Sequence, residues 1–388
     1  MNHEALIARQ RSYFTTGATR SLEFRRGALE RLGAAIEARE SEILTALHAD
    51  LGKPALDAWT SEIGLVLGEI RHALKQLKKW MKPRRAKVPM LAWPGKARVG
   101  REPCGVILIL GPWNFPLGLA FGPLAAAIAA GNCAVVKLTD LCPATAKVAA
   151  RIIAEAFDEN EVALIEGDVS VATALLELPF NHVFFTGSTR VGKIVMTAAA
   201  KHLASVTLEL GGKSPVILDT GADIDKVAAQ LAGAKQFNGG QACISPDYVF
   251  VREEQQARLV EGFKTNVAKN LYDESGAIRK ESIAQIVNQA NFNRVKALFD
   301  DAVAQGATVA VGGTMDESDL TIHPTLLTGV TPQMKILQEE IFAPVLPVMN
   351  YETIDQAIDY IAARDKPLAL YIYSDDEAAI EKVISRTS

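Results

Sequence analysis

Cys243 stands in a setting that suits covalent catalysis. It ends the segment N-G-G-Q-A-C at positions 238–243, in a polar turn ahead of an expected strand at 248–251. Loops carried on a rigid scaffold concentrate reactive groups, and the glycine pair 239–240 allows close backbone approach to a ligand. A lone cysteine can equally be a small core residue, so the residue types leave both readings open. The other cysteines lack this context and are expected to be packing residues: Cys104, Cys133 and Cys142.

Glu209 ends an apolar run directly before Leu210-Gly211-Gly212-Lys213. A carboxylate there is costly to bury unless it is paired or functional, and it could serve as a general base. A dinucleotide fingerprint would also place a ribose-binding carboxylate about 20 residues beyond its glycine loop, close to Glu209. The residues alone leave three roles open: a base, a cofactor ligand, and a salt-bridged or exposed strand end.

A glycine-containing turn, F-T-G-S-T-R-V-G at 185–192, lies between an expected strand and an expected helix. In that context backbone N–H groups and a helix N-terminus can hold a phosphate. The segment departs from G-x-G-x-x-G, because Ser188 and Thr189 fill its middle. Alone it is a weak signal for a dinucleotide.

Further polar residues follow expected strands. In P-W-N-F-P at 112–116, Asn114 could donate its amide to an oxyanion or could cap a rigid turn. Lys137 could bind a ribose or phosphate, or be a solvated strand-end lysine. The segment Q-E-E-I-F-A-P at 338–344 reads, by itself, as a charged loop.

The elements that must position these residues form an α/β pattern. After N-terminal helices and a basic connection at 82–87, continuous apolar strands alternate with helices, which predicts a parallel sheet covered on both faces. A second α/β pattern begins at 211, with a helix expected over 283–305 and a final strand over 368–373. The expected strands of the first pattern are 106–110, 134–138, 162–166, 183–185 and 206–210.

Composition excludes several classes of protein. The 388 residues carry 41 basic and 45 acidic side chains, a net charge of −4, which gives no reason to expect nucleic acid or an anionic membrane as partner. Four cysteines without a C-x-x-C pair and six histidines without ligand spacing predict no disulfide scaffold and no metal site. The uncharged stretch 103–136 is broken by prolines and glycines and predicts a βαβ element rather than a membrane span. No apolar signal follows the N-terminus, which predicts a cytoplasmic protein.

Four motifs together resemble those of the NAD(P)-dependent aldehyde dehydrogenases: P-W-N-F-P at 112–116, F-T-G-S-T-x-V-G at 185–192, E-L-G-G-K-S-P at 209–215 and N-x-G-Q-x-C at 238–243. The likeness extends over essentially the whole chain, and Pro246-Asp247-Tyr248 resembles the class-3 branch and its coniferyl-aldehyde-type relatives, which act on medium-chain and aromatic aldehydes. The resemblance implies a Rossmann-like NAD(P)-binding domain at 1–84 and 102–210. It also implies a bridging or oligomerisation segment at 85–101 and a second α/β domain, catalytic, at 211–388.

The resemblance also implies residue roles. Cys243 corresponds to the nucleophile, Glu209 to the base that activates water, and Asn114 to the oxyanion donor. The residues matched to NAD or NADP binding are Pro112, Trp113, Lys137, Asp140, Gly187, Ser188, Thr189, Arg190, Val191, Gly192, Glu340 and Phe342.

The chain departs from the family pattern in three places. Lys137-Leu138-Thr139-Asp140 replaces K-P-S-E, so the choice between NAD and NADP stays open. Ala343 replaces a glycine after E-E-I-F, and relatives continue past residue 388 through a segment that includes a dimerisation strand. A homodimer is expected if that strand is present. Two alternatives follow: a truncated, catalytically silent dinucleotide-binding or interaction protein, and a thiol esterase.

Overall fold

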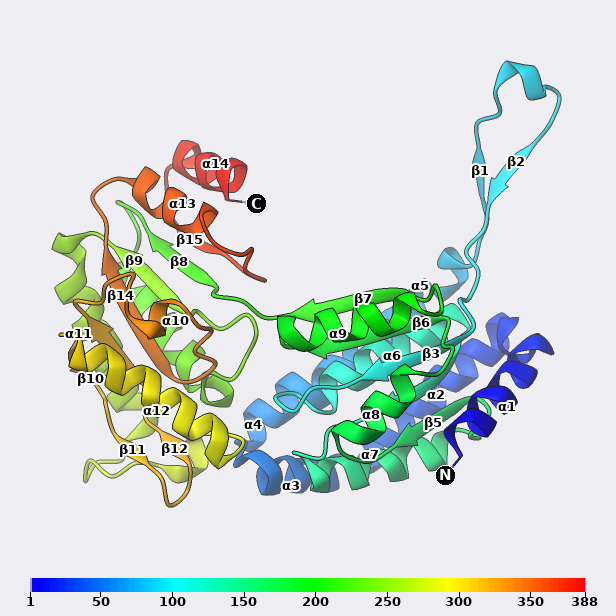
Figure 1. Ribbon diagram of the computed structural model, residues 1–388, viewed down its shortest axis with the longest axis horizontal. Coiled ribbons are helices and arrows are strands. Elements are labelled where there is room, and N and C mark those ends of the chain that lie inside the picture. Colours follow the sequence, from blue (N-terminus) through cyan, green and yellow to red (C-terminus); the bar gives the residue numbers. More distant parts are fainter. Residues whose placement is uncertain (1, 388) are drawn as a thin grey trace. The chain divides into compact units, whose positions relative to one another are not determined.

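The computed structural model describes residues 2–387 and divides them into two compact units. The first unit comprises residues 2–50 and 58–209, and the second comprises residues 51–57 and 210–387. Met1 and Ser388, the outer limits of the predicted domains, lie outside the described residues. In Figure 1 the first unit runs from blue to green and the second mostly from green to red.

The sheet of the first unit has five strands in the order β5-β4-β3-β6-β7. They are β3 (Val106–Leu110), β4 (Cys133–Lys137), β5 (Val162–Ile165), β6 (His182–Gly187) and β7 (Ser205–Leu210). Strand β3 pairs in parallel with β4 and β6, and β4 pairs in parallel with β5. The chain therefore moves outward from β3 through β5 and then crosses to the other side of β3. This reversal between β3 and β6 is the switch point at which such sheets bind ligands.

The strands of this sheet are apolar because helices pack against the sheet and bury it. The first unit contains α1 (His3–Thr15), α2 (Leu22–Ala38), α3 (Glu40–Leu51), α5 (Gly64–Trp80), α6 (Gly118–Ala130), α7 (Pro143–Ala156), α8 (Val169–Leu176) and α9 (Thr189–Ala200). Every residue of β3 and β4 is buried, as expected for strands covered on both faces. The uncharged stretch 103–136 forms β3, α6 and β4, as the sequence predicts. Within residues 2–387, none of the helices is both long and apolar enough to cross a membrane.

The basic stretch after α5 is more ordered than the sequence suggests. Instead of a plain connection it forms an antiparallel hairpin, β1 (Arg84–Ala86) with β2 (Ala97–Val99). The hairpin projects from its unit (cyan in Figure 1), with Met90, Leu91 and Trp93 exposed near its tip. Short strands of alternating basic residues have no apolar face, so the hydrophobic pattern could not reveal them.

The second unit is built on a six-stranded sheet in the order β10-β13-β14-β9-β8-β15. Its strands are β8 (Pro215–Leu218), β9 (Tyr248–Val251), β10 (Thr308–Val311), β13 (Thr325–Thr328), β14 (Val345–Asn350) and β15 (Tyr371–Tyr373). In this sheet β13 pairs in parallel with β14, β14 with β9, β9 with β8, and β8 with β15. Strand β10 pairs antiparallel with β13. Neighbouring strand residues alternate between two apolar cores: Val216 and Leu218 face one, and Ile217 faces the other. This is the second α/β pattern that the sequence predicts.

The helices of the second unit cover both faces of its sheet. They are α10 (Ile224–Gln236), α11 (Glu253–Leu271), α12 (Gln289–Ala304), α13 (Ile354–Ala362) and α14 (Glu377–Arg386). The short helix α4 (Ala55–Ala58) lies at a boundary between the units, and a short hairpin joins β11 (Met315–Asp316) to β12 (Thr321–Ile322). The prediction of a helix over 283–305 is wrong at its start. The side chain of Asn288 caps α12 by accepting the N–H of Asn291, while the N–H groups of Gln285 and Ile286 bond to distant carbonyls.

Candidate functional site

The loops predicted to bind the cofactor meet at the switch point of the first unit. Leu110 at the end of β3 is in register with Lys137 of β4 and with Phe185 of β6. The segment Pro112–Asn114 follows β3, and Gly187 ends β6. The carboxyl ends of neighbouring parallel strands thus bring the 112–116 loop, Lys137 and the 187–192 turn to one edge of the sheet.

The turn after β6 leads into the N-terminus of the 12-residue helix α9. Ser188 is its N-cap, and its hydroxyl accepts the N–H of Val191 at 3.4 Å. A Cβ on Gly187 would lie 2.5 Å from the Phe185 ring, so the position requires glycine. Ser188, Thr189 and Arg190 are exposed, and Gly192 is buried. An accessible helix N-terminus with its first N–H groups exposed fits a phosphate of a dinucleotide.

Lys137 ends β4 at the same edge of the sheet, where its ammonium fits the hydroxyl groups of a ligand. The side chain is only 6% exposed, and burial lowers the pKa of Lys137, although Asp140 and Asp168 act in the opposite direction. Across residues 2–387, no side chain or carbonyl accepts a hydrogen bond from its ammonium. The ammonium thus keeps its donors available for the oxygens of a ribose. Asp140 is exposed just beyond the strand.

Asn114 sits in a loop that is fixed from both sides. The residue is 4% exposed and lies a few residues before α6. The fully buried Glu62 caps this helix, because one of its carboxylate oxygens accepts the N–H groups of Leu117 at 3.0 Å and Gly118 at 2.6 Å. The thiol of Cys142 donates to the carbonyl of Trp113 at 3.3 Å. Sequence reasoning missed Glu62, whose only signal is a carboxylate inside an otherwise apolar helical stripe.

Glu209 differs from its expected environment. It lies on β7, an edge strand of the sheet that is only partly buried, and its side chain is exposed. This is the environment of an exposed strand end, one of the alternatives that the sequence leaves open. Its role as a base rests on the motif that it begins.

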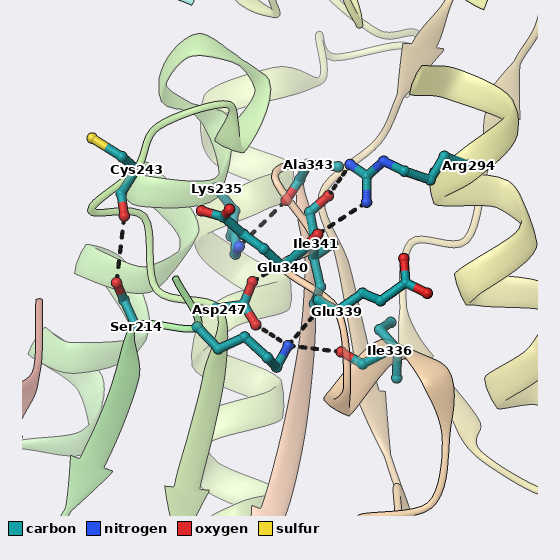
Figure 2. A network of polar contacts seen from close by, with 11 residues as sticks. Ser214, Lys235, Cys243, Asp247, Arg294, Ile336, Glu339, Glu340, Ile341 and Ala343 are labelled. Atoms are coloured by element: carbon teal, nitrogen blue, oxygen red, sulfur yellow. Dashed lines mark hydrogen bonds and ion pairs between the residues drawn. The ribbon is translucent and has the colours of Figure 1, made fainter. Parts of the chain in front are cut away.

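Cys243 lies in a strained loop of the second unit. Asn238, Gly239 and Gly240 all have left-handed backbones, with φ of 50°, 60° and 68°. A Cβ on Gly240 would lie 2.5 Å from the carbonyl oxygen of Ala343, so only glycine fits. The Cys243 side chain is half-buried, and its carbonyl accepts from the Ser214 hydroxyl at 3.4 Å. In Figure 2 its sulfur points away from the polar network below.

Buried polar groups hold this loop in shape. The amide nitrogen of the fully buried Gln241 donates to Asn238 O at 3.0 Å and to Gln285 O at 2.9 Å, and its oxygen accepts from Val287 N at 3.1 Å. The Asp57 carboxylate accepts the N–H of Asn238 at 3.2 Å. Sequence reasoning assigned no role to Gln241 or Asp57, although Gln241 belongs to the quoted motif.

A network of charged side chains organises the segment from Ile336 to Ala343 (Figure 2). Asp247 accepts the N–H of Ile341 at 2.8 Å and pairs with Lys213. Lys213 also donates to the carbonyls of Ile336 at 2.9 Å and Glu339 at 2.8 Å. The segment is thus far more constrained than the charged loop that its sequence suggests.

Glu340 and Phe342 project from this constrained segment. Burial raises the pKa of Glu340 to about 7, against an opposing hydrogen bond from the Gly212 backbone. A Cβ on Gly211 would overlap the Glu340 carboxylate, so that glycine gives the carboxylate its space. Phe342 has a left-handed backbone with φ of 51°, which costs a non-glycine residue about 1–3 kcal/mol.

The structure therefore assembles the predicted residues in two groups. Asn114, Lys137 and the 187–192 turn share one sheet edge in the first unit, whereas Cys243 and Glu340 belong to the second. Over the described part of the chain, no three His, Cys, Asp or Glu side chains are grouped as a metal ion would require.

Comparison with known proteins identifies related chains. The model of the aldehyde dehydrogenase family matches residues 2–388. AldX of Bacillus subtilis (strain 168) is 50% identical over 366 residues, which cover 94% of this chain and 82% of AldX. Aldehyde dehydrogenase family 3 member A2 of Mus musculus is 42% identical over 385 residues, covering 99% of this chain and 78% of the mouse protein.

Solved structures share the fold. The substrate-bound state of Staphylococcus aureus AldH superimposes with a TM-score of 0.95 at 40% identity, covering 100% of this chain and 84% of that one. Betaine aldehyde dehydrogenase of the same species, in complex with NAD+, gives a TM-score of 0.87 at 26% identity, covering 98% of this chain and 76% of that one.

Proposed function

This chain belongs to the aldehyde dehydrogenase family and oxidises aldehydes with NAD+ or NADP+, and from that premise we propose that Cys243 is its nucleophile. The observation that carries the proposal is the loop of three left-handed residues, braced by Gln241, that presents a half-buried thiol. No finding supports the alternative of a catalytically silent protein.

The proposed reaction begins with the Cys243 thiolate adding to the aldehyde carbon, which gives a thiohemiacetal oxyanion. The side-chain amide of Asn114 and the backbone N–H of Cys243 donate to that oxygen. Bound NAD+ or NADP+ would supply the acceptor for the hydride that has to leave this carbon. A thioester then remains on Cys243. Glu209 takes a proton from water, the hydroxide adds to the acyl carbon, and the acid leaves as the thiolate re-forms.

The proposed cofactor contacts divide between the two units. The N–H groups at the start of α9 would hold the pyrophosphate, with Lys137 and Asp140 on the adenine-side ribose, while Pro112 and Trp113 line the same crevice. Glu340 and Phe342 would hold the nicotinamide ribose and ring. The vacant ammonium of Lys137 and the exposed helix N-terminus support this assignment.

The finer points of the proposal rest on the resemblance to class-3 enzymes. We propose medium-chain or aromatic aldehydes as substrates, a homodimer bridged by residues 85–101, and a cytoplasmic location. The proposed domain roles are dinucleotide binding by 1–84 and 102–210 and catalysis by 211–388. Light scattering of the purified protein tests the dimer, and initial rates with benzaldehyde and with a medium-chain aldehyde test the substrate class.

Two substitutions test the mechanism. Cys243→Ala should abolish NADH or NADPH production, whereas Cys104→Ala, which removes an exposed cysteine, should not. Glu209→Gln should give a burst of reduced cofactor followed by slow turnover, because acylation proceeds while hydrolysis stalls. The exposed Glu177, paired with Lys201, provides the control Glu177→Gln. Full turnover by Cys243→Ala, or an unchanged steady state in Glu209→Gln, would refute the assigned role.

A further inference from the structure

The segment that carries Glu340 and Phe342 is held almost entirely through its backbone. Asp247 and Lys213 bind its first part, at Ile336 O, Glu339 O and Ile341 N. The fully buried Lys235 binds its last part, donating to Ala343 O at 3.3 Å. These contacts are made to the backbone of the segment, while the Glu340 carboxylate accepts the N–H of Gly212.

Arg294 holds the middle of the segment. Its guanidinium donates from two nitrogens to two consecutive carbonyls, Glu340 O at 2.9 Å and Ile341 O at 2.8 Å (Figure 2). Arg294 projects from α12, whose buried residues Phe292 and Val295 anchor it to the core. Burial lowers the pKa of Arg294, which marks the guanidinium as partly removed from water. A planar, two-pronged donor fixes direction as well as distance, which a single ammonium cannot do.

The two carbonyls define the peptide planes on either side of Ile341. The next residue, Phe342, has a positive φ of 51°, a conformation that persists only where the surroundings enforce it. Arg294 holds the carbonyl of the peptide group directly before Phe342, and Lys235 holds the carbonyl of Ala343, one residue further on. Removing Arg294 would release the peptide group that sets the direction of the Phe342 ring and of the Glu340 carboxylate.

We propose that Arg294 is a positioning residue for the cofactor: by clamping the carbonyls of Glu340 and Ile341, it orients the two side chains that face the nicotinamide riboside. The inference rests on the proposed roles of Glu340 and Phe342. Arg294 has no hydrogen bond to residues 238–246, so its loss should affect dinucleotide affinity far more than the reactivity of Cys243.

The test compares Arg294→Gln and Arg294→Lys with the control Lys296→Gln on the same helix, where Lys296 is exposed and pairs only with Asp300. Calorimetry gives the Kd for NAD+ and NADP+, and hydrolysis of 4-nitrophenyl acetate without cofactor reports the nucleophile. Loss of two charge-assisted hydrogen bonds should weaken binding of the preferred dinucleotide by about 10-fold or more in Arg294→Gln. Ester hydrolysis should stay within about threefold of wild type, since binding geometry and not the thiol is changed. The dinucleotide affinity of Arg294→Lys should lie between those of wild type and Arg294→Gln, and that of Lys296→Gln should match wild type.

Unchanged dinucleotide affinity in Arg294→Gln would overturn the inference alone, as would a parallel fall in affinity and ester hydrolysis, which would mark a general structural role. If Arg294→Gln does not fold, the dinucleotide affinity and ester hydrolysis of Arg294→Lys test the inference in its place. A wild-type protein that hydrolyses the ester but binds neither dinucleotide would overturn the proposed function, and the inference with it.

Discussion

Replacing Gly240 by alanine should perturb the nucleophile loop, and the contacts of Gly240 allow the loss of stability and activity to be estimated. Gly240 has φ of 68°, and an added Cβ would lie 2.5 Å from the oxygen and 2.6 Å from the carbon of the Ala343 carbonyl. The obstacle is backbone, which cannot rotate aside as a flexible side chain can. That same carbonyl accepts the hydrogen bond of Lys235, so it is held in place. Either the loop of Cys243 or the segment that follows Phe342 must move.

Two terms set the expected effect. A left-handed backbone costs a non-glycine residue about 1–2 kcal/mol. Contact with Ala343 adds displacement or strain, and the total loss of unfolding free energy should be about 2–4 kcal/mol. A shift of several tenths of an ångström in a nucleophile loop should lower kcat/KM for aldehyde by about 10- to 100-fold.

Gly276 provides the matched control. It too has a positive φ, of 80°, but no atom lies within 4 Å of where its Cβ would be. Gly276→Ala should lose only about 1–2 kcal/mol, the cost of the backbone conformation, and keep its activity. Urea unfolding measures both free energies. Alkylation of Cys243 by iodoacetamide, followed by peptide mass spectrometry to separate it from exposed Cys104, measures thiol reactivity. Equal losses in the two variants, or wild-type alkylation and turnover in Gly240→Ala, would refute the argument from close approach.

Three other outcomes follow from buried charges. Burial raises the pKa of Glu340 to about 7, and ribose hydroxyls donate to its carboxylate form. The affinity for the dinucleotide should therefore fall as the pH is lowered from about 8 to 6. Titration calorimetry should show that this pH dependence is lost in Glu340→Gln. Lys137→Met should weaken dinucleotide binding about 10-fold without lowering the thermal midpoint, since the unpartnered buried ammonium contributes no ion pair to stability. Glu62→Leu should lose about 2–4 kcal/mol in urea unfolding, because it strands the buried N–H groups of Leu117 and Gly118; a loss below about 1 kcal/mol would contradict its capping role.

The sequence predicts those parts of the fold that carry a local hydrophobic signal. Continuous apolar runs mark β3, β4 and β9, and their alternation with helices predicts the parallel sheets. The hairpin β1–β2 and the strand β13 lack such a signal, because the strands of the hairpin are three residues long and exposed, and β13 is two leucines between threonines beside a proline. The apolar residues Ile283, Ala284 and Ile286 are misleading: they are buried, yet the N–H groups of Gln285 and Ile286 bond to carbonyls distant in sequence instead of continuing a helix.

The groups that hold the site could not be found in this way. Glu62 and Gly118 are 56 positions apart, Arg294 and Glu340 are 46 apart, and Asp57 and Asn238 are 181 apart. Each pair joins a charged side chain to a backbone group, and backbone groups are the same at every position. Motif residues such as Cys243 can be recognised in the sequence because residues next to them belong to the same motif. Their supports are visible only in three dimensions.

These supports share one physical design, in which a buried charge is neutralised by the backbone of the loop that it orders. Glu62 accepts two N–H groups ahead of α6, Asp57 accepts the N–H that opens the Cys243 loop, and Arg294 donates to two carbonyls before Phe342. Part of the desolvation cost of each charge is offset by these backbone hydrogen bonds, so each charge favours the conformation of the loop that makes them. Reactive groups in such loops are held ready before substrate arrives, which lowers the reorganisation that the reaction would otherwise require. Substitutions that keep the charge but lose the donor geometry should therefore impair these loops, though less than substitutions that remove the charge.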